Sequence, residues 1–155
     1  MLITQIRPHD QAVDDEAGAP ETVRGLADAV ILDFVGGLPG FPADRTFQLE
    51  MLAPEYGPFL LMRSVTHTEI CFVLTVAGSF FPDYAVTIDE QHVANLGLES
   101  SEDAIVFAIV TLGDQATANL LGPVVVNRRT RAAAQVVQYE SGYRASEPLV
   151  PLPEA

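Results

Sequence analysis

The sequence contains no lysine, no tryptophan and only one cysteine, Cys71. One thiol excludes an internal disulfide, and such a pattern is typical of a protein in a reducing compartment. The absence of lysine excludes a Walker-type nucleotide site, because the lysine of that motif contacts the phosphates. The chain must instead be held together by its apolar residues, which at 48% are frequent enough to predict an ordered core.

Long hydrophobic runs are also missing. No apolar stretch reaches the roughly 18 residues that a membrane-spanning helix requires. The N-terminus lacks the apolar region of a secretory signal, and acidic residues follow it. The sequence therefore predicts a cytoplasmic protein that does not contact membranes.

Positive charge is scarce. Eight arginines stand against 21 acidic residues, which gives a net charge of −13. A surface this acidic repels phosphate backbones, so direct binding of nucleic acid is not expected. Two interpretations of the charge stay open: it keeps the protein soluble, or it attracts a basic protein partner.

Composition divides the chain into one domain and two tails. Residues 1–20 are acidic and show no hydrophobic period, which predicts a flexible tail, with a short edge strand around Leu2, Ile3 and Ile6 as the alternative. Residues 21–145 carry regular apolar runs and are predicted to form the domain. Residues 146–155 are rich in proline and are predicted to form a second tail.

Within the domain, short apolar runs are separated by turn residues, a pattern typical of β structure. One short helix is predicted over 91–96, with Asp89 as its N-cap and Gly97 at its end. Because strands do not alternate with long helices, the prediction is a mostly β fold: a small antiparallel β-barrel-like single domain with one short helix. A two-sheet sandwich is the alternative. Strands are predicted at 30–34, 46–51, 59–65, 70–76, 85–88, 104–111, 120–121, 124–126 and 132–139.

Residue types that carry catalysis or bind metals are few and scattered. His9, His67 and His92 form no HxH or HxxxH pair, so no metal site is predicted. Cys71 lies within an apolar run and is predicted to be a buried packing residue. No serine stands in a GxSxG motif, and the glycines form no nucleotide-binding loop. The sequence predicts a protein that is not an enzyme and has no cofactor.

Three segments carry more specific residues than a barrel requires. They are Phe-Val-Gly-Gly-Leu-Pro-Gly-Phe at 34–41, Phe-Phe-Pro-Asp-Tyr at 80–84 and Thr-Ala-Asn-Leu-Leu-Gly-Pro-Val-Val-Val-Asn at 117–127. In this order and at these spacings they resemble the FliW family, from about residue 22 to residue 143. The chain departs from the usual family pattern in having Ala77-Gly78 where a proline is common, and Gly122 where an alanine is common.

The resemblance implies a small β-barrel-like protein that binds two partners. One is flagellin, the filament subunit, held before export. The other is CsrA, a small basic dimer that represses translation, so that flagellin synthesis is coupled to filament assembly. We expect this chain to be a monomer when it is free.

Each segment of the resemblance has a structural and a functional interpretation. In the structural interpretation, the three glycines of 34–41 permit a tight turn and Phe34 and Phe41 belong to the core. The aromatic residues of 80–84 then form a corner of the core, the asparagines tie down backbone groups, and Gly122-Pro123 forms a bulge or a strand switch. Alternatively, the segments contact a partner. The candidate partner-binding residues are Leu38, Pro39, Phe41, Phe80, Phe81, Tyr84, Asn119, Pro123 and Asn127.

Two other functions are weighed against protein binding. A small-molecule-binding barrel predicts an open apolar cavity, whereas a closed interior packed with apolar side chains argues against it. The interior is expected to contain Phe47, Leu61, Phe72, Val106 and Val125. A hydrolase requires a serine or Cys71 within hydrogen-bond reach of His67 or His92.

Overall fold

The computed structural model describes residues 4–6, 30–52, 59–139 and 141–149. The tail predicted over 1–20 lies outside these residues except for 4–6. Between the strands lie the helix α3 (Glu90–Leu96) and two 3₁₀ turns, η2 (Ala77–Ser79) and η3 (Ser101–Asp103). The strands are β1 (Thr4–Ile6), β2 (Val30–Phe34), β3 (Thr46–Met51), β4 (Phe59–Ser64), β5 (Cys71–Val76), β6 (Val86–Ile88), β7 (Ala104–Thr111), β8 (Thr117–Asn127), β9 (Ala132–Gln135) and β10 (Glu147–Pro148).

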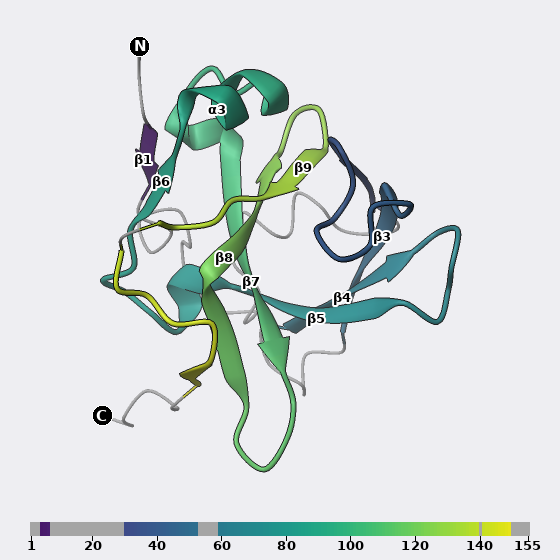
Figure 1. Ribbon diagram of the computed structural model, residues 1–155, viewed down its shortest axis with the longest axis vertical. Coiled ribbons are helices and arrows are strands. Elements are labelled where there is room, and N and C mark those ends of the chain that lie inside the picture. The colour runs from purple at the N-terminus through teal and green to yellow at the C-terminus, as the bar shows by residue number, and fades with distance from the viewer. Residues whose placement is uncertain (1–3, 7–29, 53–58, 140, 150–155) are drawn as a thin grey trace.

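Seven of these strands close into a barrel (Figure 1). Strands β2, β3, β4, β5, β7 and β8 are successive antiparallel neighbours, and β9 lies between β8 and β2. The junction of β9 with β2 is parallel, with Asp33 opposite Ala132 and Phe34 opposite Ala133. Closure removes the free edges that a sandwich would keep, so the predicted barrel is confirmed and the sandwich alternative is wrong.

Two short strands extend this framework. Strand β1 pairs with β6, and β10 pairs with the first residues of β8. The edge strand considered near Ile6 therefore exists as β1. Residues 147–148 lie in the segment predicted to be the proline-rich tail, yet they add a strand beside the barrel.

The barrel interior is filled by one face of each strand. Along β2, Val30, Leu32 and Phe34 are buried, whereas Ile31 and Asp33 between them are exposed. This alternation is the period of two that a half-buried strand requires. The interior core comprises Val30, Leu32, Phe34, Leu38, Phe47, Leu49, Leu60, Met62, Leu74, Val76, Ile105, Phe107, Val124, Val126 and Ala133.

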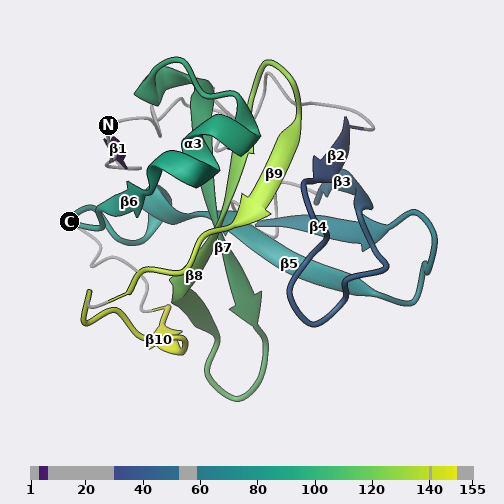
Figure 2. The same cartoon turned by 45° about the horizontal axis from the view of Figure 1, so that its top comes forward.

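A second core lies on the outer wall of the barrel. In β7, Ile105 and Phe107 belong to the interior, whereas Ala104, Val106 and Ala108 face outward, yet all five are buried. The outward residues pack with side chains of β6 and of α3, and Figure 2 shows α3 between β6 and β9. A strand covered on both faces is apolar throughout, which explains the uninterrupted run in β7.

Five side chains were predicted to fill the interior of the barrel, and the structure places only some of them there. Phe47 lies in the barrel core, and Phe72 packs against that core while staying half-buried. Val106 and Val125 belong to the outer core, and Leu61 alternates with the inward Leu60 and Met62 and is half-buried. Sequence alternation does not reveal that a second layer covers the outside of the barrel.

Strand β8 bends where the sequence contains Gly122 and Pro123. Its register against β7 shifts between Val124, which lies opposite Phe107, and Asn119, which lies opposite Ile109. The predicted bulge is thus confirmed within one continuous strand. A Cβ on Gly122 would lie 2.8 Å from Nε2 of Gln135, so a larger residue would push that side chain aside.

Most predicted element boundaries agree with the structure to within one residue, including those of α3. The N-cap prediction is confirmed, because the Asp89 carboxylate accepts a hydrogen bond from the backbone N–H of His92 at 2.8 Å. Gly97 ends the helix with a φ of 68°. Strand β9 ends four residues earlier than predicted, since Val136 and Gln138 bond to the irregular part of β8 instead of continuing the ladder.

The prediction that Cys71 is buried is wrong. Cys71 is the first residue of β5 and is exposed. It lies opposite Arg63 on the outward side of the sheet, where no second layer of described residues covers it. The apolar residues that follow Cys71 predict a strand buried along its whole length. In the structure, only the last three residues of β5, up to Val76, are buried.

Candidate functional site

The Gly-Leu-Pro-Gly segment forms a compact loop between β2 and β3. Gly36, Gly37 and Gly40 have φ values of 82°, 85° and 88°, a backbone conformation that favours glycine. Leu38 is buried in the barrel core, and its backbone forms an isolated antiparallel β-bridge with Phe41. These contacts confirm the structural interpretation of the glycines.

The loop leaves two of its candidate residues accessible. Pro39 is exposed, and the Phe41 side chain keeps 37% of its surface exposed. Phe41 is therefore not a core residue. Its ring nevertheless meets that of Phe72 edge to face, with the ring centroids 5.6 Å apart. Contact with the barrel wall therefore fixes the position of this ring.

Behind this loop lies a polar cluster that the sequence did not predict. The Ser64 hydroxyl donates to Oδ1 of Asp44 at 2.6 Å, and Nδ1 of His67 lies 2.7 Å from the same oxygen. Hydrogen bonds from Ser64 and His67 hold the pKa of the Asp44 carboxyl below its ordinary value. The hydrogen bond and the charge of Asp44 raise the pKa of His67. The cluster fastens the loop to the hairpin of β4 and β5.

This cluster has the residue types of a hydrolase but a different connectivity. In a catalytic triad, histidine accepts the proton of serine and the carboxylate holds the histidine. Here the serine and histidine side chains both bind the carboxylate, and Ser64 is buried. The Ser64 Oγ also accepts from the backbone N–H of His67 at 3.0 Å. The hydroxyl is engaged in holding the loop and is not presented to a substrate.

The candidate residues of β8 make contacts within the fold. Oδ1 of Asn119 accepts from the backbone N–H of Gly122 at 2.9 Å, and Pro123 is buried. Asn127 is fully buried, and its amide donates to the carbonyl of Leu96 at 2.8 Å. The structural interpretation of both asparagines is confirmed, because each ties down a turn or a helix end.

The segment 80–84 borders a surface groove of about 310 Å³. Phe80 and Phe81 are half-buried, and Tyr84 is buried with its hydroxyl donating to the carbonyl of Leu120 at 2.6 Å. Burial and the neighbouring Tyr143 raise the pKa of Tyr84, which keeps this hydroxyl a donor. We call this hollow the aromatic groove. It is lined by Phe80, Phe81, Pro82, Asp83, Tyr84, Leu120, Tyr143 and Glu147.

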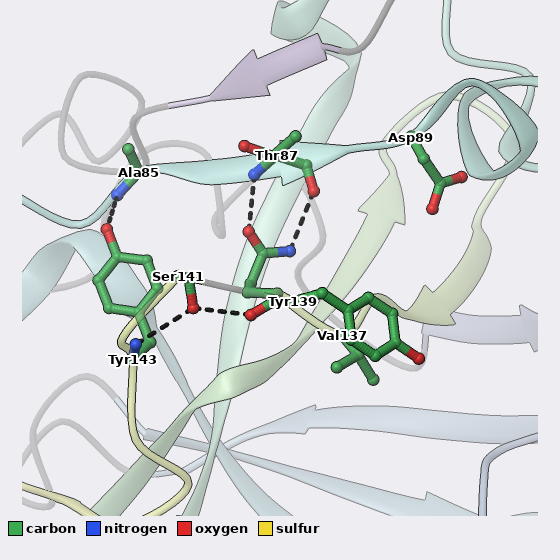
Figure 3. A pocket seen from close by; sticks show the side chains of 8 residues that line it. Ala85, Thr87, Asp89, Val137, Tyr139, Ser141 and Tyr143 are labelled. Carbon is green, nitrogen blue, oxygen red and sulfur yellow. Dashed lines mark hydrogen bonds between the residues drawn. The ribbon is translucent and has the colours of Figure 1, made fainter.

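A second hollow, of about 390 Å³, lies on the other side of Tyr143, between β6 and residues 137–139 and 141–143 (Figure 3). The side-chain amide of Gln138 binds both backbone groups of Thr87 in β6. Its oxygen accepts from the N–H of Thr87 at 2.8 Å, and its nitrogen donates to the carbonyl of Thr87 at 3.0 Å. The Tyr143 hydroxyl accepts from the N–H of Ala85 at 3.0 Å. Side chains thus satisfy backbone groups that another strand would otherwise bind.

The structure separates the nine candidate residues into different places. Phe80, Phe81 and Tyr84 line the aromatic groove together, and the other six candidate residues are not among the described residues that line it. Asp83, Tyr143 and Glu147 also line the aromatic groove but are not among the residues predicted from the sequence. Asp83 lies inside a motif that was singled out, but the other two come from the C-terminal segment and carried no local signal.

The described residues contain no group of three or more histidine, cysteine, aspartate or glutamate side chains placed to hold a metal ion. Within the same ranges, no helix has the length and hydropathy needed to cross a membrane.

Comparison with known proteins relates the whole domain to one family. The FliW protein family profile matches residues 21–149. The flagellar assembly factor FliW of Bacillus licheniformis is 40% identical over 119 residues, covering 75% of this chain and 82% of the relative. That of Bacillus subtilis is 34% identical over 122 residues, covering 77% and 85%. A crystal structure of the flagellar assembly factor FliW superposes with a TM-score of 0.74 at 31% identity, covering 78% of this chain and 86% of that one.

Proposed function

This chain belongs to the FliW family of flagellar assembly factors, and from that premise we propose that it acts by binding proteins. It holds flagellin in the cytoplasm before export. When it is free of flagellin, it binds CsrA and relieves translational repression, which couples flagellin synthesis to filament assembly. Neither step requires catalysis, so the protein is not an enzyme in this proposal.

The observation that carries the proposal beyond family membership is the charge. The net charge of −13 on 155 residues is complementary to a basic RNA-binding dimer. Two of the arginines are already engaged locally, Arg129 with Asp103 at 3.1 Å and Arg63 with Glu50 at 3.6 Å. A negative field accelerates encounter with a basic partner and opposes binding of RNA to the same surface.

The alternative of a small-molecule-binding barrel has less support. Phe34, Phe47 and Phe107 are fully buried within the barrel, together with the aliphatic side chains around them. The space in which a barrel of this size would hold a ligand is occupied by the protein's own side chains. The two hollows described above are open surface features outside the ring.

Calorimetric titration against CsrA and against flagellin, each from the same source as this chain, tests the proposal. Binding of both partners is expected, and the affinity for CsrA is expected to fall as salt is raised, because screening weakens attraction between exposed charges. Affinity without salt dependence would keep the function but remove the role of the charge. A folded protein that binds neither partner would contradict the proposal.

A further inference from the structure

The aromatic groove presents apolar rings that the fold does not fully cover. Phe80 stacks on Phe59 with ring centroids 5.8 Å apart and lies 6.4 Å from the ring of Phe81. Both Phe80 and Phe81 remain half-buried, and Pro82 beside them is exposed. Contiguous accessible aromatic side chains are typical of sites where a partner inserts an apolar residue.

The opposite wall of the groove is held in place before any partner arrives. The rings of Tyr84 and Tyr143 meet edge to face at 4.7 Å. Each tyrosine hydroxyl is hydrogen-bonded to the backbone, that of Tyr84 to Leu120 and that of Tyr143 to Ala85. Because these side chains are already ordered, binding here costs little side-chain entropy.

The charged side chains among the described residues that line the groove are both acidic, Asp83 and Glu147. Neither carboxylate forms an ion pair with another described residue. Two acidic groups beside an apolar hollow favour an occupant in which an apolar side chain is followed closely by a positive charge.

The size of the groove limits what it can hold. A volume of about 310 Å³ is at the lower end of the range for ligand pockets, so it accommodates one or two side chains rather than a domain surface. The groove therefore suits a short projecting segment of a larger partner.

We propose that the aromatic groove docks a segment of the basic partner in which an apolar side chain inserts between Phe80, Phe81 and Tyr143 while a flanking lysine or arginine meets Asp83 and Glu147. This assignment rests on the proposed function, in which the basic partner is CsrA.

Neutralising the rim tests the assignment without disturbing the core. The variant D83N/E147Q removes both charges, and D114N/E102Q is its matched control, with the same chemical change at two exposed positions outside the groove. In calorimetry with CsrA, D83N/E147Q is expected to bind roughly five- to tenfold more weakly, with a reduced salt dependence, and the control less than about twofold more weakly.

A second variant probes the apolar half of the groove. Phe80→Ala, with folding checked by its thermal transition, is expected to weaken CsrA binding by roughly tenfold or more. Equal losses in the rim variant and its control, or losses confined to flagellin, would overturn the assignment. If the unaltered protein binds neither partner, the proposed function itself fails, and that outcome is distinct from retained binding by the groove variants.

Discussion

The segments 34–41 and 80–84 are alike in sequence, each combining phenylalanines with a proline, but the structure uses them differently. The first is a loop defined by backbone conformation, with Leu38 in the core and Phe41 held against Phe72. The second forms one wall of a groove, in which half-buried Phe80 and Phe81 lie beside the acidic side chains of Asp83 and Glu147. Residues that identify the family therefore serve mainly folding in one place and are available to a partner in the other.

The largest effect is expected at Gly37. A Cβ there would lie 2.7 Å from the backbone oxygen of Pro42, and the φ of 85° already disfavours alanine. Gly37→Ala is expected to lower the free energy of unfolding by about 2–4 kcal/mol. Gly40→Ala is the matched control, because its φ of 88° carries the same strain but nothing lies within 4 Å, so about 1 kcal/mol is expected. Urea denaturation measures both, and equal losses would show that the close approach of Pro42 adds nothing to the strain of the positive φ at this position.

A smaller effect is expected where the groove joins the outer core. Tyr84→Phe removes the hydrogen bond to Leu120 and leaves a buried carbonyl without that donor, so a loss of about 1–2 kcal/mol in unfolding free energy is expected. Tyr139→Phe serves as the control, since 81% of Tyr139 is exposed and less than about 0.5 kcal/mol is expected. If the two variants unfold at the same urea concentration, the hydroxyl of Tyr84 does not hold the groove wall.

The smallest effect concerns pH and distinguishes the loop from the groove. The pKa of His67 is raised above its ordinary 6.5, so its contact with Asp44 stabilises the fold fully below pH 6.5 and is lost as pH rises through the folded-state value. The pKa of Asp44 is lowered from 3.8, so its contribution is present above pH 3.8 and is lost as pH falls through the folded-state value.

His67→Ala should therefore remove part of the loss of stability that the unaltered protein is expected to show as the pH rises above 6.5. His92→Ala, which changes a histidine on α3 instead, should keep that part of the pH dependence. Urea denaturation across this range measures both variants. If the pH dependence is the same with and without the His67 ring, the contact with Asp44 does not stabilise the loop.

Short sequence patterns predicted the extent of several elements correctly. The cap residues Asp89 and Gly97 reflect contacts within a few residues, whereas the alternation of 30–34 and the apolar run of 104–111 reflect how each strand is buried, and each prediction agrees with the structure. The exposure of Cys71 was missed because it depends on whether a second layer covers that part of the sheet, which strand alternation does not encode.

The sites depend on residues far apart in the sequence. Asp44 meets His67 across 23 positions, and Ala85 meets Tyr143 across 58. The motif at 80–84 indicated one wall of the groove, but the other wall is supplied by Leu120 in the irregular part of β8 and by the return of the chain through 143–147. These contacts form only in the complete fold, and no short sequence pattern predicts them.

Hydrogen–deuterium exchange of the protein, alone and saturated with CsrA, compares the two segments most directly. We expect slower exchange on binding at 80–84 and 143–147, with exchange at 36–42 unchanged. Slower exchange confined to 36–42, with none around the aromatic groove, would contradict it and would make the glycine loop the docking surface.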